Sequence, residues 1–498
     1  MFFPRSSGVL LHPTCFPSQF GIGDLGYEAS RFIEFLAESN QQYWQILPLS
    51  PCDENPYVSY GAMAGNPLLI SPEKLRDEGK LFDSDFWYLP EFNSEKVEFE
   101  KVKQTKMPLL EKACEHFKVN ATQEQQKEFR EFCEVARYWL DDYALFMAFR
   151  DTFGTPWYEW KPEIVKRDRQ AIELWRRRLA PEIFFHKYLQ FEFFRQWLNL
   201  KNYANEKRIK IIGDIPIYVS HNSADVWANR EIFCLNEATN QPILVAGTPP
   251  DDFSSSGQLW GNPVYNWEYL QSTRFAWWVE RVRETLAYVD LIRIDHFRGL
   301  ESFWSVPAGE ETAINGRWVK APGHALFETI RAELGSLPIL AEDLGDIDQA
   351  VLDLRDHFEF PGMKILHFAF GSDAQNAYLP FNFNANCVVY TGTHDNDTTV
   401  GWYNQASDHE RWRLHQYLGC TGSDGIAWDL IRLTLSSVTN QAIIPLQDVF
   451  SLGTDARMNA PGTAEGNWGW RYRGEALTQE YSDRLRDMVF IYGRQNIN

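Results

Sequence analysis

Residues 289–296 read V-D-L-I-R-I-D-H, an apolar run that ends in charged residues. Such a run is typical of a buried strand, and Arg293 and Asp295 lie two positions apart, on one face of that strand. Because a nearby cation favours the ionised form of a carboxyl group, we expect Arg293 to lower the pKa of Asp295. An ionised carboxylate at the end of a buried strand suits covalent attack on a sugar carbon. A structural salt bridge that caps the strand is the alternative.

Similar short apolar runs recur along the chain, separated by stretches long enough for helices. Alternating strands and helices indicate parallel strands joined by helical crossovers. We therefore predict an α/β protein folded as an eight-stranded (β/α)8 TIM barrel, with an eighth strand near residues 8–11 or 68–70. Active sites of such barrels lie at the carboxyl ends of the strands. The other predicted strands cover residues 43–49, 209–212, 289–294, 339–340, 364–368, 387–390 and 442–446.

The domain organisation expected is a single catalytic barrel over residues 1–498 with two insertions. Residues 75–205, approximately, are expected to be mostly helical, including a helix over 123–152 that begins at a capping box and stops at Gly154. Residues 215–285, approximately, carry the loop 247–263, which is rich in Gly, Pro and Ser. Its aromatic residues, Phe253 among them, make this loop a candidate lid, with an ordinary surface turn as the alternative.

The composition of the chain limits which partners and which compartment the protein can have. The 498 residues have a net charge of −20, which argues against nucleic acid and anionic membranes as partners. Seven scattered cysteines without a C-x-x-C pair indicate free thiols in a reducing compartment. No signal peptide or membrane-length apolar stretch is recognisable, so we expect a cytoplasmic protein. Aromatic residues make up 15% of the chain. This enrichment suits stacking on sugars, although a large core also uses aromatic residues.

Two further carboxylates follow apolar runs. Glu342 has no basic residue within several positions, so burial is expected to raise its pKa, as a general acid requires. A carboxylate at a helix N-terminus is the alternative. Asp395 lies in T-H-D-N-D at 393–397 and could bind sugar hydroxyls. Metal binding with His394 and Asp397 is the competing interpretation, but the spacing matches no standard metal loop.

Several motifs together resemble one family over almost the whole chain. They are similar to those of the 4-α-glucanotransferases, called amylomaltases or disproportionating enzymes, which form glycoside hydrolase family 77. The three motifs that carry most of the resemblance are D-L-I-R-I-D-H-F-R-G at 290–299, I-L-A-E-D-L-G at 339–345 and Y-T-G-T-H-D-N-D-T at 390–398. Weaker matches lie at 59–67, 213–219, 254–263 and 456–471.

The resemblance implies roles for individual residues. It implies Asp295 as nucleophile, Glu342 as acid/base and Asp395 as stabiliser of the transition state. Arg293 would orient the nucleophile, and further residues would contact sugar: Asp214, His296 and His394, with Tyr60, Gln258, Trp260, Asn459 and Trp468 as weaker subsite candidates. A structural histidine remains the alternative for each histidine, and a core position for each tryptophan.

The implied activity is a retaining transfer. A segment of an α-1,4-glucan would move from a donor to the 4-hydroxyl of an acceptor glucan or glucose, without a cofactor or metal. The implied partners are maltooligosaccharides, amylose or glycogen-type glucans. An α-amylase-type hydrolase and a non-catalytic glucan-binding protein are the alternatives.

Overall fold

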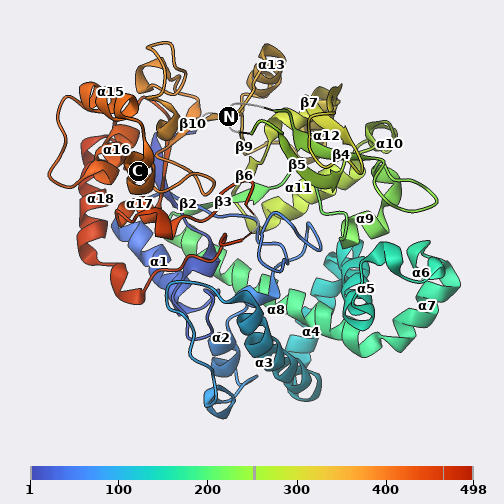
Figure 1. The fold of residues 1–498 in the computed structure, drawn as a ribbon. Helices are drawn as coiled ribbons and strands as arrows, with labels where there is room; N and C mark the ends of the chain where they lie inside the picture. Colours follow the sequence, from blue (N-terminus) through green and yellow to red (C-terminus); the bar gives the residue numbers. More distant parts are fainter. Residues whose placement is uncertain (1–2, 251–253, 464, 496–498) are drawn as a thin grey trace.

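Eight parallel strands form the centre of the molecule (Figure 1). The computed structural model describes residues 3–250, 254–463 and 465–495. A hydrogen bond of 2.9 Å from the Ala341 nitrogen to the Pro361 oxygen joins the edge strands and brings the sheet round into a barrel. The strands, in their order around the sheet, are β10 (Gly362–Ile365), β11 (Cys387–Tyr390), β12 (Gln441–Pro445), β1 (Ser6–Leu10), β2 (Tyr43–Gln45), β3 (Lys210–Ile215), β6 (Leu291–Ile294) and β9 (Ile339–Ala341).

The predicted (β/α)8 barrel is confirmed, and β1 supplies its eighth strand. The alternative at residues 68–70 is wrong, because Pro67–Leu69 form a 3-10 turn. The side chain of Asn66 accepts a hydrogen bond of 3.0 Å from the Leu68 nitrogen, which starts that turn. Proline at the first position also favours a turn, since its φ angle is already fixed near the required value.

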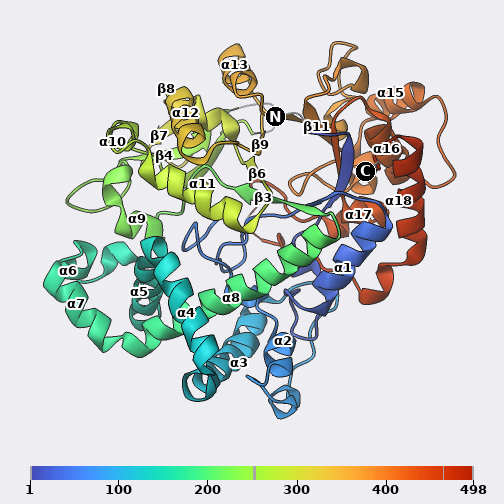
Figure 2. The same cartoon turned by 180° about the vertical axis from the view of Figure 1, so that it is seen from behind.

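Helices surround the barrel. In the view of Figure 2, α1, α8 and α11 cross its outer face. Residues 366–386, all of which are described, join β10 to β11 through 3-10 turns in place of a crossover α-helix. The helices between and after the barrel strands are α1 (Tyr27–Glu38), α8 (Ala180–Glu206), α11 (Ala276–Tyr288), α12 (Gly323–Leu334), α13 (Gln349–His357), α14 (Thr399–Gln405), α15 (Asp408–Leu418), α16 (Ile426–Ser436), α17 (Leu446–Val449) and α18 (Gln479–Ile491).

A group of helices between β2 and β3 lies to one side of the barrel (Figure 1). The single helix expected over 123–152 is two helices, which meet at Ala136. The expected capping box is present at Thr122 and Gln125, and Gly154 ends the second helix in the left-handed conformation. These helices are α2 (Pro72–Asp77), α3 (Phe99–Asn120), α4 (Gln123–Val135), α5 (Arg137–Phe153), α6 (Pro162–Val165) and α7 (Arg169–Arg178).

A small antiparallel sheet stands beside the carboxyl ends of the strands, with the order β5-β4-β7-β8. It combines β4 (Leu244–Thr248) and β5 (Gln258–Pro263) with β7 (Ser302–Pro307) and β8 (Arg317–Lys320). None of these four strands was expected from the sequence. Gln258–Pro263 was predicted to belong to the loop 247–263, but it forms β5, because it pairs with β4. Short helices α9 (Ala224–Ala228) and α10 (Trp267–Ser272) flank the sheet. Phe253 of the predicted lid loop lies outside the described residues.

All seven cysteines are free thiols in the structure. Within the described part of the chain, no helix combines the length and apolar character that crossing a bilayer requires.

Candidate active site

Asp295 and Glu342 emerge side by side from neighbouring strands. The register pairs Ile294 of β6 with Ala341 of β9, so the next residue of each strand lies at the same rim of the barrel. The Glu342 nitrogen donates a hydrogen bond of 3.1 Å to the Ile294 oxygen. The His296 nitrogen donates to the Glu342 carboxylate. The backbone of the nucleophile segment therefore holds the predicted acid/base.

His296 follows Asp295 in the left-handed backbone conformation, with φ of 50°. A residue with a Cβ atom pays about 1–3 kcal/mol for such a conformation, so the surrounding contacts must impose it. Here it turns the chain sharply at the end of β6 and points the His296 nitrogen at Glu342. Strain stored at this position is consistent with a functional site.

Arg293 lies between two carboxylates. Its Nη1 donates to Asp214 Oδ2 at 2.6 Å and to Asp295 Oδ1 at 3.1 Å. The guanidinium is almost wholly buried, and Asp214 comes from the paired position on β3. Asp343, the neighbour of Glu342, faces elsewhere and accepts a hydrogen bond of 2.7 Å from the Met363 nitrogen. The adjacent residues Glu342 and Asp343 therefore face different surroundings just after the end of β9.

Side chains from a loop that is distant in the sequence hold Asp395 in place. Asn459 Nδ2 donates to Asp395 Oδ1 at 2.6 Å, and Arg457 Nη2 donates to the Asp395 backbone oxygen at 2.8 Å. Asp397 accepts hydrogen bonds from Thr454 Oγ1 and Gln405 Nε2 instead, at 2.9 and 2.8 Å. The T-H-D-N-D motif therefore divides its two aspartates between different surroundings, which does not favour a shared metal ion.

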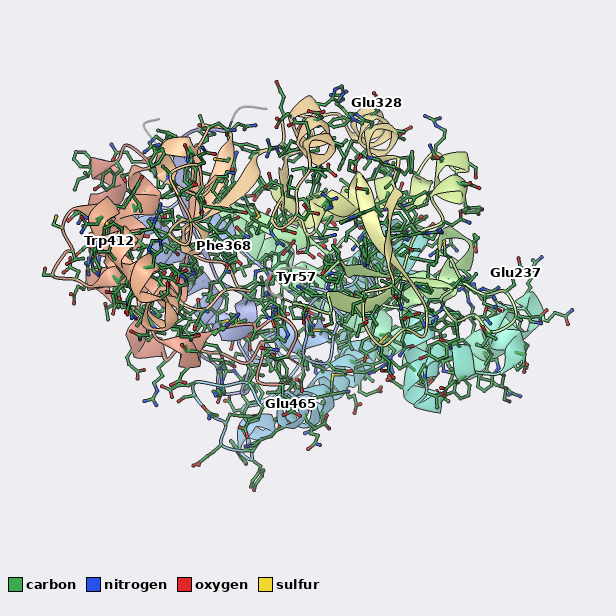
Figure 3. The ribbon with its side chains drawn as sticks, turned by 45° about the horizontal axis from the view of Figure 1, so that its top comes forward. Tyr57, Glu237, Glu328, Phe368, Trp412 and Glu465 are labelled. Carbon is green, nitrogen blue, oxygen red and sulfur yellow. The ribbon has the colours of Figure 1, made fainter. Side chains whose placement is uncertain are left out.

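Tyr57 connects Asp214 with His394, although the sequence prediction missed this tyrosine. Its hydroxyl donates to Asp214 Oδ2 at 2.6 Å and lies 2.8 Å from His394 Nε2. The tyrosine ring stacks on the His394 ring, with centroids 5.4 Å apart, and Trp468 packs against both rings. Figure 3 places Tyr57 near the middle of the molecule. The signal was the first tyrosine of P-Y-V-S-Y at 56–60, of which only the second, Tyr60, was selected.

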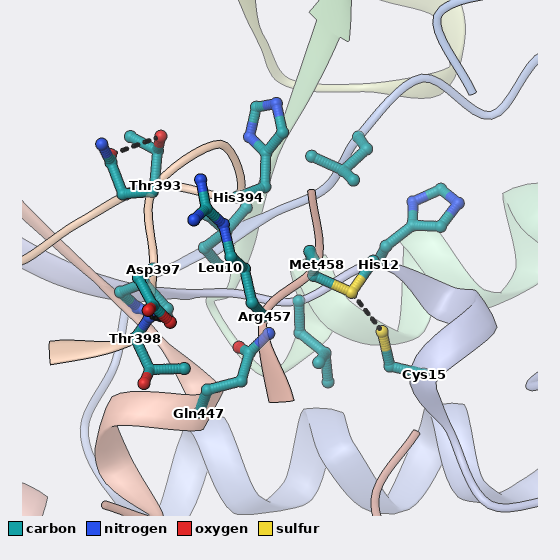
Figure 4. Close-up of a pocket in the computed structure, with 14 residues that line it drawn as sticks. Leu10, His12, Cys15, Thr393, His394, Asp397, Thr398, Gln447, Arg457 and Met458 are labelled. Atoms are coloured by element: carbon teal, nitrogen blue, oxygen red, sulfur yellow. Dashed lines mark hydrogen bonds between the residues drawn. The ribbon is translucent and has the colours of Figure 1, made fainter. Parts of the chain in front are cut away.

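A pocket opens behind His394, between the ends of β1, β11 and β12 (Figure 4). His12, Arg457 and Met458 line it, and the Cys15 thiol lies 3.8 Å from the Met458 sulfur. Burial lowers the pKa of His12 to about 3 and also lowers that of His394, which favours neutral imidazoles there. The pocket therefore places two neutral histidines behind the Asp395 side of the site, beside the charged side chains of Arg457 and Asp397.

Burial dominates the acid–base properties of the two adjacent carboxyl groups. It raises the pKa of Asp295, and Asp214 and Asp395 add to the rise while Arg293 opposes it. Arg293 lowers the pKa of Asp295, as predicted, but burial outweighs it and the net shift is upward, since Arg293 shares its charge with Asp214 and Asp295 loses most of its water. Burial likewise raises the pKa of Glu342, as predicted, with Asp295 adding to the rise. Of these two carboxyl groups, Asp295 is the one that the described contacts show hydrogen-bonded to the Arg293 guanidinium, so Asp295 ionises before Glu342.

The remaining predicted residues divide into two groups. Trp260 meets the His296 ring edge-on at 4.7 Å, and its Nε1 donates to Gln258 Oε1 at 3.3 Å. Trp260 therefore borders the nucleophile segment, Gln258 is hydrogen-bonded to Trp260, and Trp468 borders Tyr57. Tyr60 has other partners, since its hydroxyl donates to Asp53 and accepts from Arg150 at 2.8 Å.

Comparison with known proteins decides the family. A family model described as 4-alpha-glucanotransferase, glycoside hydrolase family 77, matches residues 11–478. The chain belongs to the 4-alpha-glucanotransferase family. A 4-alpha-glucanotransferase of Synechocystis sp. is 52% identical over 496 residues, covering 99% of this chain and 98% of that family member. One from Thermus thermophilus is 45% identical, covering 98% and 99%.

A solved structure in the 4-alpha-glucanotransferase family shares the whole architecture. The amylomaltase from Streptococcus agalactiae in complex with acarbose has a TM-score of 0.96 at 38% identity, covering 99% of this chain and 100% of that one. The transferase class and the fold expected from the sequence are thereby confirmed.

Tyr57→Phe tests the bridging hydroxyl in this 4-alpha-glucanotransferase. The variant keeps the ring that stacks on His394 but loses the hydrogen bonds to Asp214 and His394. We expect kcat/KM for maltotriose to fall by about 10- to 100-fold, since a hydrogen bond to a charged group contributes about 1.5–3 kcal/mol. Tyr27→Phe is the matched control, because its hydroxyl also donates to a carboxylate, Asp77, but at the surface. Equal losses in both variants would contradict the assignment.

Proposed function

We propose that Asp295, Glu342 and Asp395 transfer a glucan segment by two successive displacements at one anomeric carbon. The adjacency of Asp295 and Glu342 at the ends of paired strands carries this proposal. Two carboxyl groups about 5–5.5 Å apart support retention, because one can attack the carbon while the other protonates the leaving oxygen. Asp395, fixed by Asn459, would hold sugar hydroxyls against them.

In the first displacement, Glu342 gives its proton to the glycosidic oxygen as Asp295 attacks the anomeric carbon. The glycosidic bond breaks, the fragment that carried the reducing end leaves, and a covalent glucosyl–Asp295 ester remains. The buried Arg293 offsets the charge of Asp295 before attack and that of the carboxylate when it is released.

In the second displacement, Glu342 takes the proton from the 4-hydroxyl of an acceptor. That oxygen attacks the anomeric carbon from the face opposite the ester bond, and Asp295 is released. Water competes for the same step and would give hydrolysis. We propose that Trp260, Gln258 and Tyr60, in the outer subsites, favour the sugar by binding it and excluding solvent.

The proposed donors are maltooligosaccharides, amylose and glycogen-type chains, and glucose is a proposed acceptor. We propose further that residues 1–498 act as one catalytic barrel, with residues 75–205 and 215–285, apart from the barrel helices α8 and α11, as insertions that shape its substrate groove. The free cysteines support a reducing compartment, and we propose the cytoplasm.

Maltotriose alone tests the reaction. We expect glucose together with maltooligosaccharides longer than maltotriose, separated by thin-layer chromatography, because each transfer lengthens an acceptor. Added labelled glucose should enter the oligosaccharides if it serves as an acceptor. Products no longer than maltotriose would mean that water is the acceptor and would contradict the proposal.

A further inference from the structure

The loop of residues 391–399, which carries Asp395, is fastened at both ends to one buried carboxylate, that of Asp448. Thr391 and Thr399 lie at the two ends of this loop, at equal distances along the chain from Asp395. The Thr391 hydroxyl donates to Asp448 Oδ2. Thr399 donates twice to Asp448, from its hydroxyl to Oδ2 at 2.8 Å and from its nitrogen to Oδ1 at 2.7 Å. The two ends of the loop therefore cannot move apart without breaking these bonds.

His367 ties a third strand end to the same group. It lies in the turn after β10, and its Nε2 is 3.0 Å from Thr399 Oγ1. Because that hydroxyl gives its proton to Asp448, it accepts the proton of His367 Nε2. Trp402 stacks on the imidazole with ring centroids 4.8 Å apart. A Cβ atom at Gly392 would lie 2.6 Å from His367 Cε1, so only glycine lets the loop lie against this ring.

The four polar residues His367, Thr391, Thr399 and Asp448 thus form one connected group, which we call the Asp448 clamp. Asp448 belongs to α17, which follows β12 directly, and Thr391 follows β11. The strands β10, β11 and β12 are neighbours in the barrel, so the clamp joins their carboxyl ends. The catalytic edge of the barrel is therefore fixed on the side where Asp395 lies.

Asp448 is a costly residue at a position that needs only packing. Its side chain is 1% exposed, and the hydrogen bonds described for it come from the two threonines and include no basic side chain. A buried carboxylate destabilises the folded state unless hydrogen bonds or a cation compensate it. All three of its donors belong to the loop of residues 391–399. Satisfying this carboxylate therefore requires the loop to adopt one conformation.

We propose that Asp448 is a positioning residue for glucan transfer, which sets the place of Asp395 by holding both ends of its loop. The proposal rests on the proposed role of Asp395 in the transition state. Asn459 and Arg457 hold Asp395 itself, whereas the clamp holds the backbone on either side of it. A displaced catalytic group loses most of its effect, since the reacting atoms tolerate only small errors of position.

Thr391→Val tests the clamp, because valine keeps the shape of the side chain and removes its hydroxyl. We expect kcat for maltotriose to fall by about 10- to 100-fold, as small displacements of catalytic groups do. KM should stay within about twofold of the wild type, since the lost interaction acts in the transition state. Rates are measured per folded enzyme, well below the melting temperature. Thr399→Val is the second variant, and Thr391→Ser, which restores the hydroxyl, should recover most of the activity.

Thr434→Val is the matched control for a buried hydroxyl. Thr434 is as deeply buried as Thr391, but its hydroxyl donates to the Leu430 oxygen of its own helix, at 2.8 Å. We expect a lower melting temperature with wild-type kcat and KM. An equal fall of kcat in Thr434→Val would show a general effect of lost stability and would overturn the proposal. Wild-type kcat in both Thr391→Val and Thr399→Val would also overturn it.

A double variant separates the clamp from the role of Asp395. In an Asp395→Asn background, Thr391→Val should lower kcat no further, because the clamp acts through the carboxylate that is already absent. If Asp395→Asn has a low kcat that Thr391→Val lowers again by the same factor, the clamp is refuted and the role of Asp395 stands. If Asp395→Asn keeps wild-type kcat, the proposed role of Asp395 is refuted, and the clamp with it.

Discussion

Asp295→Asn is expected to abolish both transfer and hydrolysis, with kcat/KM for maltotriose lowered by at least about 10⁴-fold. The amide is a poor nucleophile, so the covalent ester cannot form. The change also leaves Arg293 with Asp214 as its remaining carboxylate partner among the contacts described. Initial-rate measurements by release of glucose and by appearance of longer chains separate the two activities.

Asp290→Asn is the matched control for this result. Asp290 precedes the same strand and accepts a hydrogen bond of 2.7 Å from the Ile211 nitrogen at the opposite end of the barrel. Residues at that end affect stability more than chemistry. We expect a lower melting temperature with nearly wild-type kcat. Substantial transfer by folded Asp295→Asn would eliminate Asp295 as nucleophile.

Glu342→Gln is expected to lower the maltotriose rate by about 10²- to 10⁴-fold, the usual contribution of a general acid or base. An α-glucosyl fluoride needs no proton for departure, so the first displacement should survive. The glucosyl ester should then accumulate, because no base activates the acceptor. Mass spectrometry should find the added sugar on the peptide that contains Asp295.

Added azide and the pH profile sharpen this prediction. Azide attacks without a general base, so it should restore turnover of the fluoride in Glu342→Gln. In the wild type, Glu342 must be protonated, and its raised pKa keeps activity up to higher pH than an ordinary glutamate would allow. In Glu342→Gln with the fluoride as substrate, the rate should no longer fall at alkaline pH. A fluoride rate that falls as much as the maltotriose rate would refute the acid role.

Much of the barrel could be predicted from sequence because its strands are short, apolar and regularly spaced. The ends of β6, β9 and β11 also follow from this pattern, and with them the positions of Asp295 and Glu342. Residues 68–70 could not be distinguished from β1 by composition, so both segments were candidates for the eighth strand. Only the side chain of Asn66 and the ring of Pro67 make that segment a turn.

The predictions that failed concern properties that depend on contacts between segments distant in the sequence. The pKa of Asp295 could not be predicted, because the local sequence shows Arg293 but neither Asp214 as its competitor nor the depth of burial. Tyr57 was missed for the same reason, since its partners come from β3 and the loop after β11. Trp468 and Asn459 were identified only through the family resemblance.

The pairing of β1 with β12 has a consequence for biogenesis. Ser6 lies beside Gln441, so the first strand to leave the ribosome waits for the last before it gains its second neighbour. Contacts so remote along the polypeptide slow folding and leave strand edges unprotected in the meantime. Catalytic competence therefore requires that β12 has been synthesised, and a polypeptide terminated before β12 is expected to be an open sheet prone to aggregation.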